Sequence, residues 1–259
     1  MALFTDTTVL TLDDLLPYEA TLAEIASPHG INVETKIRLA SSAMGDKLMV
    51  WLLDAGVSDP QFVMRRQIGL STVVVTPALR RWLSFESLSR FYAEAYNVQL
   101  NPRFQGKWVE YQQESEKARD LVVGGGVGIV YHPLPAPSAP QVTVGAGTLA
   151  AQSLFVQTAW VDASGVESEV STVNGLLLND NSGITVSMTE TGVQIPPTAT
   201  GWNVYLSSSQ TRPALQNSAP LALGSNWGPS GGGVVTGAAP TGGQRPDFYV
   251  PVGNRIRRG

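Results

Sequence analysis

The sequence predicts an α+β multidomain protein, with an N-terminal all-α helical bundle followed by a C-terminal all-β sandwich. Apolar residues recur every three or four positions in the first half, but every second position beyond residue 141. The charge changes at the same place: residues 1–139 hold 15 acidic and 12 basic side chains, whereas residues 140–238 hold five and one. A length of 259 residues accommodates two domains of ordinary size.

The helical domain is expected over residues 1–126. Thr11 with Asp14 three positions later is typical of a helix start, and Pro17 is expected to divide the segment that follows. Asn32 is placed to begin a longer helix, which Gly56 is expected to end. These signals predict two short helical pieces and then a long amphipathic helix.

Thr76-Pro77 is the clearest helix start in the chain, since it pairs a capping hydroxyl with proline at the first helical position. A last helix carries Trp108 and Tyr111 on its apolar stripe. Tryptophan side chains on apolar helix stripes are expected in the core, so we expect Trp51, Trp82 and Trp108 to be buried. The connection over 57–75 contains Arg65 and Arg66 and is expected to be a loop, with a short strand near its end.

Residues 127–140 are rich in proline and follow a glycine run, which predicts a linker. The sandwich is expected over 141–238, where alternating apolar positions such as Trp202, Val204 and Leu206 indicate strands. The segment 154–161 is apolar on both faces, as in a central strand. Residues 228–243 are Gly- and Pro-rich and resemble a further linker, and residues 239–259 are expected to form a basic tail.

The sequence offers no constellation for catalysis, so we expect no enzyme, no catalytic residue, no cofactor and no metal ion. The absence of cysteine excludes disulfides and thiolate metal sites. His29 and His132 lie at a helix end and in the linker, where surface roles are expected, and neither is paired for zinc. The segment 179–183 lacks the closing Glu of a calcium loop and is expected to be a turn.

The formal net charge of −4 does not indicate a nucleic-acid-binding protein, because such proteins usually carry a basic excess. No N-terminal signal peptide and no apolar run long enough for a membrane span are found in the sequence. We therefore expect a chain that is made in the cytoplasm and either stays soluble or enters a soluble assembly.

The N-terminal block resembles the head–tail adaptor (connector) family of tailed bacteriophages over about residues 1–135. The segment Ala95-Tyr96-Asn97-Val98-Gln99-Leu100-Asn101-Pro102-Arg103-Phe104-Gln105-Gly106-Lys107-Trp108 carries the resemblance, together with the helices over 12–25 and 37–53 and the start at Thr76. The resemblance implies a helical subunit that assembles as a ring beneath the portal.

The second block resembles an immunoglobulin or fibronectin type III module of the kind found in phage virion proteins. Residues 155–169 and 200–207 carry this resemblance, with an Ala-Ser-Gly turn after the first strand and Trp202 and Tyr205 on opposite faces of the second. Such modules are widespread, so this resemblance concerns architecture more than role.

Together the resemblances imply a structural virion protein of the phage neck, at the head–tail junction. The implied partners are the portal protein, tail or tail-completion (nozzle or stopper) proteins, further copies of the chain in a ring of twelve, and packaged DNA passing through without sequence specificity. No membrane contact is implied. Arg65 and Arg66 are candidate channel or partner contacts. The candidate portal contacts are in the tail: Phe248, Tyr249, Arg255, Arg257 and Arg258.

Two other functions remain open. The sandwich could be a host-surface or carbohydrate-binding virion module, which exposed aromatic side chains at its loop ends would support. A glycosidase with a β appendage would need two carboxylates about 5–10 Å apart in a cleft. The predicted sandwich is poor in acidic residues, so the sequence disfavours that enzyme.

Overall fold

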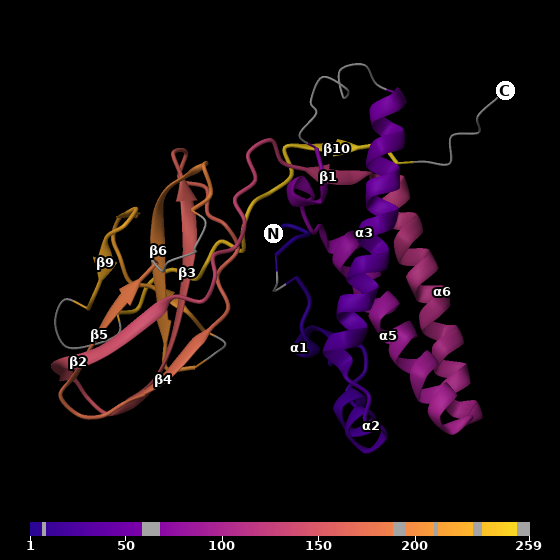
Figure 1. Cartoon of the computed structure of the whole chain (residues 1–259), viewed down its shortest axis with the longest axis horizontal. Coiled ribbons are helices and arrows are strands. Elements are labelled where there is room, and N and C mark those ends of the chain that lie inside the picture. Colours follow the sequence, from indigo (N-terminus) through magenta and orange to yellow (C-terminus); the bar gives the residue numbers. More distant parts are fainter. Residues whose placement is uncertain (7–8, 59–67, 189–194, 210–211, 230–234, 253–259) are drawn as a thin grey trace. The chain divides into compact units, whose positions relative to one another are not determined.

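The computed structural model describes residues 1–6, 9–58, 68–188, 195–209, 212–229 and 235–252 (Figure 1). The chain is an α+β protein with antiparallel sheets, as predicted. It divides into two compact units, each formed by two stretches of the chain. We call residues 9–131 with 246–259 the helical unit, and residues 1–8 with 132–245 the β unit.

The described elements of the helical unit are mainly helices, with one short strand from each of its two stretches. They are α1 (Leu12–Leu15), α2 (Leu22–His29), α3 (Val33–Ser58), the 3-10 turn η1 (Leu70–Thr72), α5 (Pro77–Gln99), α6 (Pro102–Gly125), β1 (Val127–Ile129) and β10 (Phe248–Val250).

Three predicted helix starts are confirmed by their hydrogen bonds. The Asp14 carboxylate accepts from the Thr11 amide at 2.8 Å, the Asn32 side chain accepts from the Thr35 amide at 2.9 Å, and the Thr76 hydroxyl accepts from the Leu79 amide at 3.4 Å. Each bond satisfies an amide that the first helical turn leaves without a partner.

Two helix boundaries differ from the prediction. α3 continues to Ser58, so Gly56 does not end it. α6 begins at Pro102, well before the stripe that predicted it, and the Asn101 side chain accepts from the Arg103 amide at 3.0 Å. Asn101-Pro102 is the same kind of start signal as Thr76-Pro77, and the sequence prediction overlooked it.

α5 packs antiparallel against both α3 and α6 (Figure 1). Near the start of α5, Trp82 stacks on Trp51 of α3 with ring centroids 5.5 Å apart; near its end, Tyr92 stacks on Tyr111 of α6, also at 5.5 Å. Trp82 is buried as predicted, but Trp51 is only half-buried. The reason is that Trp51 covers the Trp82 ring from outside.

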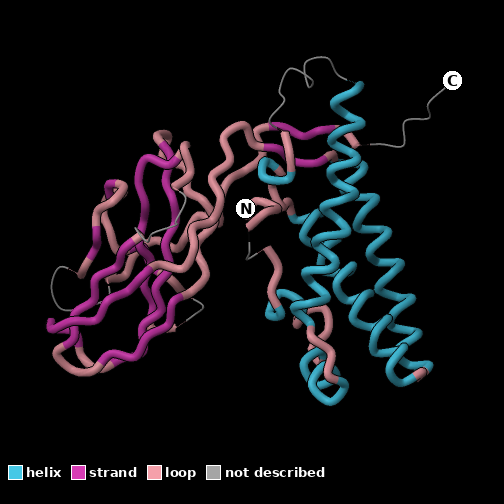
Figure 2. The backbone as a smooth tube through the Cα atoms, viewed as in Figure 1, coloured by secondary structure: helices cyan, strands magenta, loops and turns pink. Residues whose placement is uncertain are grey.

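β10 pairs antiparallel with β1, and Val250 lies opposite Val127. On its other side β1 meets the segment after η1, where the Val74 amide donates to the Gly128 carbonyl at 2.9 Å. The short strand expected near the end of the 57–75 connection is therefore present as a bridge to β1. The strand from the predicted tail was not foreseen (Figure 2).

The β unit contains two antiparallel sheets. One has the strand order β2-β5-β9; the other has β4-β3-β6-β7, with β8 also pairing with β6. The strands are β2 (Gln141–Leu149), β3 (Gln152–Asp162), β4 (Asn174–Leu178), β5 (Ser182–Ser187), β6 (Ala199–Ser207), β7 (Ala214–Leu215), β8 (Leu221–Ala222) and β9 (Asn226–Trp227).

The two sheets share one hydrophobic core. Trp160 of β3 lies opposite Trp202 of β6, and both indoles are buried together with Val186 of β5. The apolar segment 154–161 is central, as predicted, because β3 has β4 on one side and β6 on the other. The sequence predicted that one face of β6 is buried. Its other face is buried too, as the burial of Asn203 and Tyr205 shows.

The far face of β6 is covered by residues that the sequence predicted to be linker and tail. The Leu215 amide donates to the Ala238 carbonyl at 2.8 Å, and the Thr241 amide donates to the Glu167 carboxylate at 3.3 Å. Gly237 permits this contact, because a Cβ there would overlap the Leu215 carbonyl oxygen. Glycine-rich composition here serves close backbone packing rather than a free linker.

Residues of the predicted 127–140 linker also pack and form hydrogen bonds within the fold. Leu134 is buried in the core of the β unit, and the Gln244 side chain holds its backbone. That side chain accepts from the Leu134 amide at 2.7 Å and donates to the His132 carbonyl at 2.9 Å. The N-terminal residues join the β unit as well, since Asp6 accepts from the Ala136 amide at 3.0 Å.

Among the described residues, no helix is both long enough and apolar enough to cross a membrane.

Candidate interaction surfaces

The segment that carries the adaptor resemblance forms the end of α5, a tight turn and the start of α6. The turn depends on Leu100, whose backbone is left-handed with φ 51° and whose amide donates to the Tyr96 carbonyl at 2.6 Å. Glycine usually occupies such a position, because a side chain there costs conformational energy. Leucine at this turn is therefore unfavourable for the fold.

The same turn exposes apolar side chains. Val98 is 57% exposed and Leu100 is 70% exposed, and the neighbouring Arg103 side chain also faces solvent. We call these three residues the hairpin tip. Two large apolar side chains together on a tip are typical of a contact site, whereas single exposed ones are common.

An aromatic layer behind the tip fixes the two helices. Tyr96 stacks on Trp108 with centroids 6.2 Å apart, and the Tyr111 hydroxyl donates to the Glu19 carboxylate at 2.9 Å. Burial acts to raise the pKa of Glu19, but hydrogen bonds from Thr21, Tyr111 and Tyr92 and the nearby Lys107 outweigh it and lower that pKa. The hairpin tip therefore projects from a rigid base.

Strongly alkaline solution is expected to unfold the helical unit. Burial and the adjacent Glu19 raise the pKa of Tyr92 and Tyr111 above the ordinary value of 10. A raised pKa of this kind stabilises the fold below pH 10, and the contribution is lost as the pH rises toward the folded value. The part of the tyrosinate absorbance that is absent from a Tyr92→Phe/Tyr111→Phe double variant should rise together with loss of the helical circular dichroism signal. If that part of the absorbance rises while the helical signal is retained, the prediction is contradicted.

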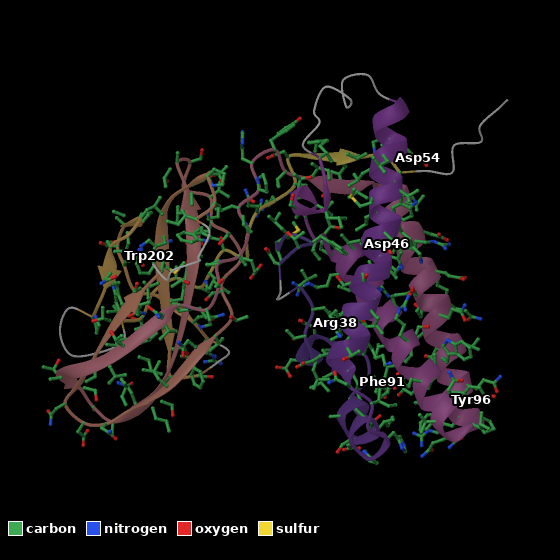
Figure 3. All side chains as sticks on the ribbon, viewed as in Figure 1. Arg38, Asp46, Asp54, Phe91, Tyr96 and Trp202 are labelled. Atoms are coloured by element: carbon green, nitrogen blue, oxygen red, sulfur yellow. The ribbon has the colours of Figure 1, made fainter. Side chains whose placement is uncertain are left out.

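The outer face of α3 is the second exposed apolar surface of the helical unit. Leu39, Val50 and Leu53 lie on one side of the helix, and Val50 and Leu53 are 56% and 63% exposed. Asp46, which is labelled in Figure 3, is exposed. It is seven residues, or about two helical turns, beyond Leu39 and therefore lies on the same side of the helix. We call these four residues the α3 stripe. Its character is apolar with one exposed acid.

The predicted portal contacts divide into two groups. Phe248 lies in β10 and stacks on Tyr131 with ring centroids 4.8 Å apart, so it packs within its own chain. Tyr249 is half-exposed on the same strand and remains accessible to a partner. The other predicted portal contacts, Arg255, Arg257 and Arg258, lie outside the described residues. The predicted channel or partner contacts, Arg65 and Arg66, lie outside them as well.

A cavity of about 250 Å³ lies among α3, α5 and α6. Trp108, which was predicted to be core, is half-buried at its edge. Ligand pockets usually hold roughly 300–1,000 Å³, so this cavity is small. Both acids and bases line it, which gives no preference for a ligand charge. The lining residues are Lys47, Trp82, Glu86, Ser89, Trp108, Gln112, Ser115, Glu116 and Arg119.

Glu167 forms a buried polar network in the β unit that the sequence did not reveal. The side chain is 7% exposed, and its Oε1 accepts from the Asn203 amide nitrogen and from the Tyr205 hydroxyl, the latter at 2.5 Å. Its Oε2 accepts from the Thr241 amide. Burial and the Glu167 carboxylate raise the pKa of Tyr205. The network attaches the 235–245 segment to the sheet.

Glu167→Gln is expected to lower the free energy of unfolding of the β unit by about 1–2 kcal/mol. An amide keeps only one acceptor oxygen, so at least one buried donor of the network loses its partner. Urea denaturation measures the loss. Glu169→Gln is the matched control, because Glu169 is only half-buried. Equal stability of the Glu167 variant and the parent would show that the network is energetically unimportant.

Among the described residues, no group of three or more His, Asp or Glu side chains is arranged to hold a metal ion. Comparison of the chain with models of protein families, with curated protein sequences and with solved structures finds no match.

Proposed function

We propose that this chain is a structural protein of a tailed-phage neck, which forms a ring that joins the portal to the tail and continues the DNA channel. One observation carries the proposal. The segment over 95–108, whose sequence resembles the adaptor family, folds into a helical hairpin with an exposed apolar tip. Exposed tips on rigid helices suit assembly rather than catalysis.

A ring of identical subunits needs two different surfaces on each subunit that fit one another. The helical unit offers two such surfaces in the hairpin tip and the α3 stripe. The family resemblance implies twelve copies around passing DNA, with tail or tail-completion proteins below. Arg65 and Arg66 are the proposed contacts to the channel or to a partner.

The β unit is proposed to have an immunoglobulin-like arrangement on the outside of the ring. In that arrangement strands B and E belong to one sheet and strands C, F and G to the other. β2 and β5 correspond to the first pair, and β3, β6 and β7 to the second set. The buried Trp160 on β3 supports the assignment, because a buried tryptophan is typical of strand C.

The basic tail is proposed to dock on the portal. β10 is paired with β1 shortly before residue 253 in the chain, and Tyr249 on that strand is half-exposed. Arg255, Arg257 and Arg258 would supply charge around an aromatic anchor.

A chain that ends at Val252 tests tail docking without removing β10. The full chain should bind purified DNA-filled heads of its phage at full occupancy, and the shortened chain should lose most of that binding. Replacing the three tail arginines by lysine, which keeps the charge, is the matched control. Equal binding by the shortened chain would overturn tail docking, and failure of the full chain to bind heads would overturn the proposed function.

The alternative function is a host-surface or carbohydrate-binding module in the β unit. Sugar-binding surfaces commonly present aromatic faces, but in the described part of the β unit Trp160 and Trp202 are buried and Trp227 packs against the core. Binding of the whole chain to a glycan array would favour the alternative. The neck proposal expects no binding there.

A further inference from the structure

We propose that the hairpin tip of one copy of this chain docks on the α3 stripe of a second copy, so that the two surfaces form a head-to-tail interface. The inference rests on the proposed function and deepens it by naming the residues that join neighbouring subunits. It starts from two exposed apolar features of one unit for which the described part of the chain supplies no cover.

Leu100 has a backbone conformation that is unusual for leucine. Its left-handed backbone at φ 51° would suit glycine, yet the chain places there a leucine that is 70% exposed. A residue that is unfavourable for the fold and apolar in solvent is explained by a contact outside the unit. Val98 beside it provides a second apolar anchor.

The hairpin tip and the α3 stripe also carry opposite charges. Arg103 accompanies the tip, and Asp46 lies within the α3 stripe. Neither side chain takes part in an ion pair among the described residues. An exposed base beside one apolar surface and an exposed acid within the other make the two complementary.

The outer face of α6 is a less favourable partner for the α3 stripe than the hairpin tip. The outer face of α6 carries exposed Glu116 and Asp120, together with Val109. Packing that face on the stripe would bring further acids against Asp46, which opposes association. α6 also exposes Leu121 beside Lys117, but Lys117 is already paired with Glu114. The hairpin tip brings Arg103, a base that takes part in no ion pair among the described residues. Because the tip and the stripe are different surfaces, their contact is heterologous, as a ring requires.

Leu100→Gly tests the apolar part of the interface. The variant should fold with an unchanged or slightly higher midpoint of thermal unfolding, because glycine relieves the left-handed backbone. Self-association, measured by sedimentation velocity over a concentration series, should weaken at least about tenfold. Leu177→Ser is the matched control: Leu177 is 82% exposed on β4, so its loss should leave association unchanged.

A charge exchange tests the pairing itself. Asp46→Arg and Arg103→Asp should each weaken self-association by about fivefold, and the double variant should recover most of the loss. Only residues that face one another across the interface give this recovery.

The inference is overturned if the parent chain stays monomeric at every concentration, if Leu100→Gly associates like the parent, or if the double exchange is no better than the single ones. If self-association is unaffected by these substitutions, the subunits of the ring meet through a different interface. The proposed function fails separately, if the full chain does not bind DNA-filled heads.

Discussion

A chain that ends at Arg245 is expected to lose roughly 3–6 kcal/mol of the free energy of unfolding of its helical unit. The deletion removes β10 from β1 and takes away Val250 and Val252, which are both buried. Burial of each valine contributes about 1.5–3 kcal/mol. The packing of Pro246 over Gly128 is lost as well.

Urea denaturation followed by the helical circular dichroism signal measures this loss. A chain that ends at Val252 is the control and should unfold like the full chain, because β10 and both valines remain. Similar unfolding of all three chains would contradict the assignment of β10 to the helical unit. The pair of truncations also separates folding from docking, since only the longer one keeps the strand from which the basic tail starts.

Trp202→Ala is expected to cost the β unit about 3–5 kcal/mol, the usual range for removing a large aromatic side chain from a core. Trp202 is fully buried between the sheets (Figure 3). It lies opposite Trp160 across the β3–β6 pairing, and its Nε1 donates to the Ala222 carbonyl at 3.1 Å. The variant loses this hydrogen bond and leaves a cavity.

Scanning calorimetry measures the cost as a lower midpoint for the β unit. Trp227→Ala is the matched control, because Trp227 is only half-buried on the short strand β9. The control should lose clearly less stability than Trp202→Ala. A loss below about 1 kcal/mol for Trp202→Ala would contradict its place in the core.

Local signals in the sequence predicted the local structure well. Helices begin at Thr11, Asn32 and Thr76 as predicted, because each capping bond joins residues three apart. The Asn32 and Thr76 side chains accept from helix amides, and the Asp14 carboxylate accepts from the Thr11 amide. The alternation of Trp202, Val204 and Leu206 predicted the core face of β6, because every second side chain of a strand points to the same face of the sheet. Asn101 carried an equally readable signal that the prediction overlooked.

Contacts between distant parts of the chain were not predictable in this way. β10 is three residues long and pairs with a strand about 120 residues earlier, and no pattern in Phe248–Val250 identifies that partner. Gln244 and Glu167 are polar residues whose burial depends on backbone segments remote in sequence. The Gly-rich composition of the 235–245 segment favoured a linker, because composition does not distinguish flexibility from close packing.

The candidate surfaces were predicted only in part. The sequence identified the 95–108 segment through its resemblance, but the exposure and left-handed backbone of Leu100 required the structure. The sequence named both Phe248 and Tyr249 as portal contacts, and this stays a prediction. The structure adds that Phe248 is half-buried against Tyr131 and that Tyr249 is more exposed. The α3 stripe was not predicted, because the periodicity of α3 identifies the face that packs in the core, and the exposure of Leu39, Val50 and Leu53 on the other side required the structure.

The proposed ring of a phage neck is tested most directly by cryo-electron microscopy of virions that carry a tagged copy of the chain. We expect tag density at the head–tail junction, on a closed ring beneath the portal with the helical units lining the channel. Tag density on the capsid surface or on tail fibres, or virions without the tagged chain, would contradict it.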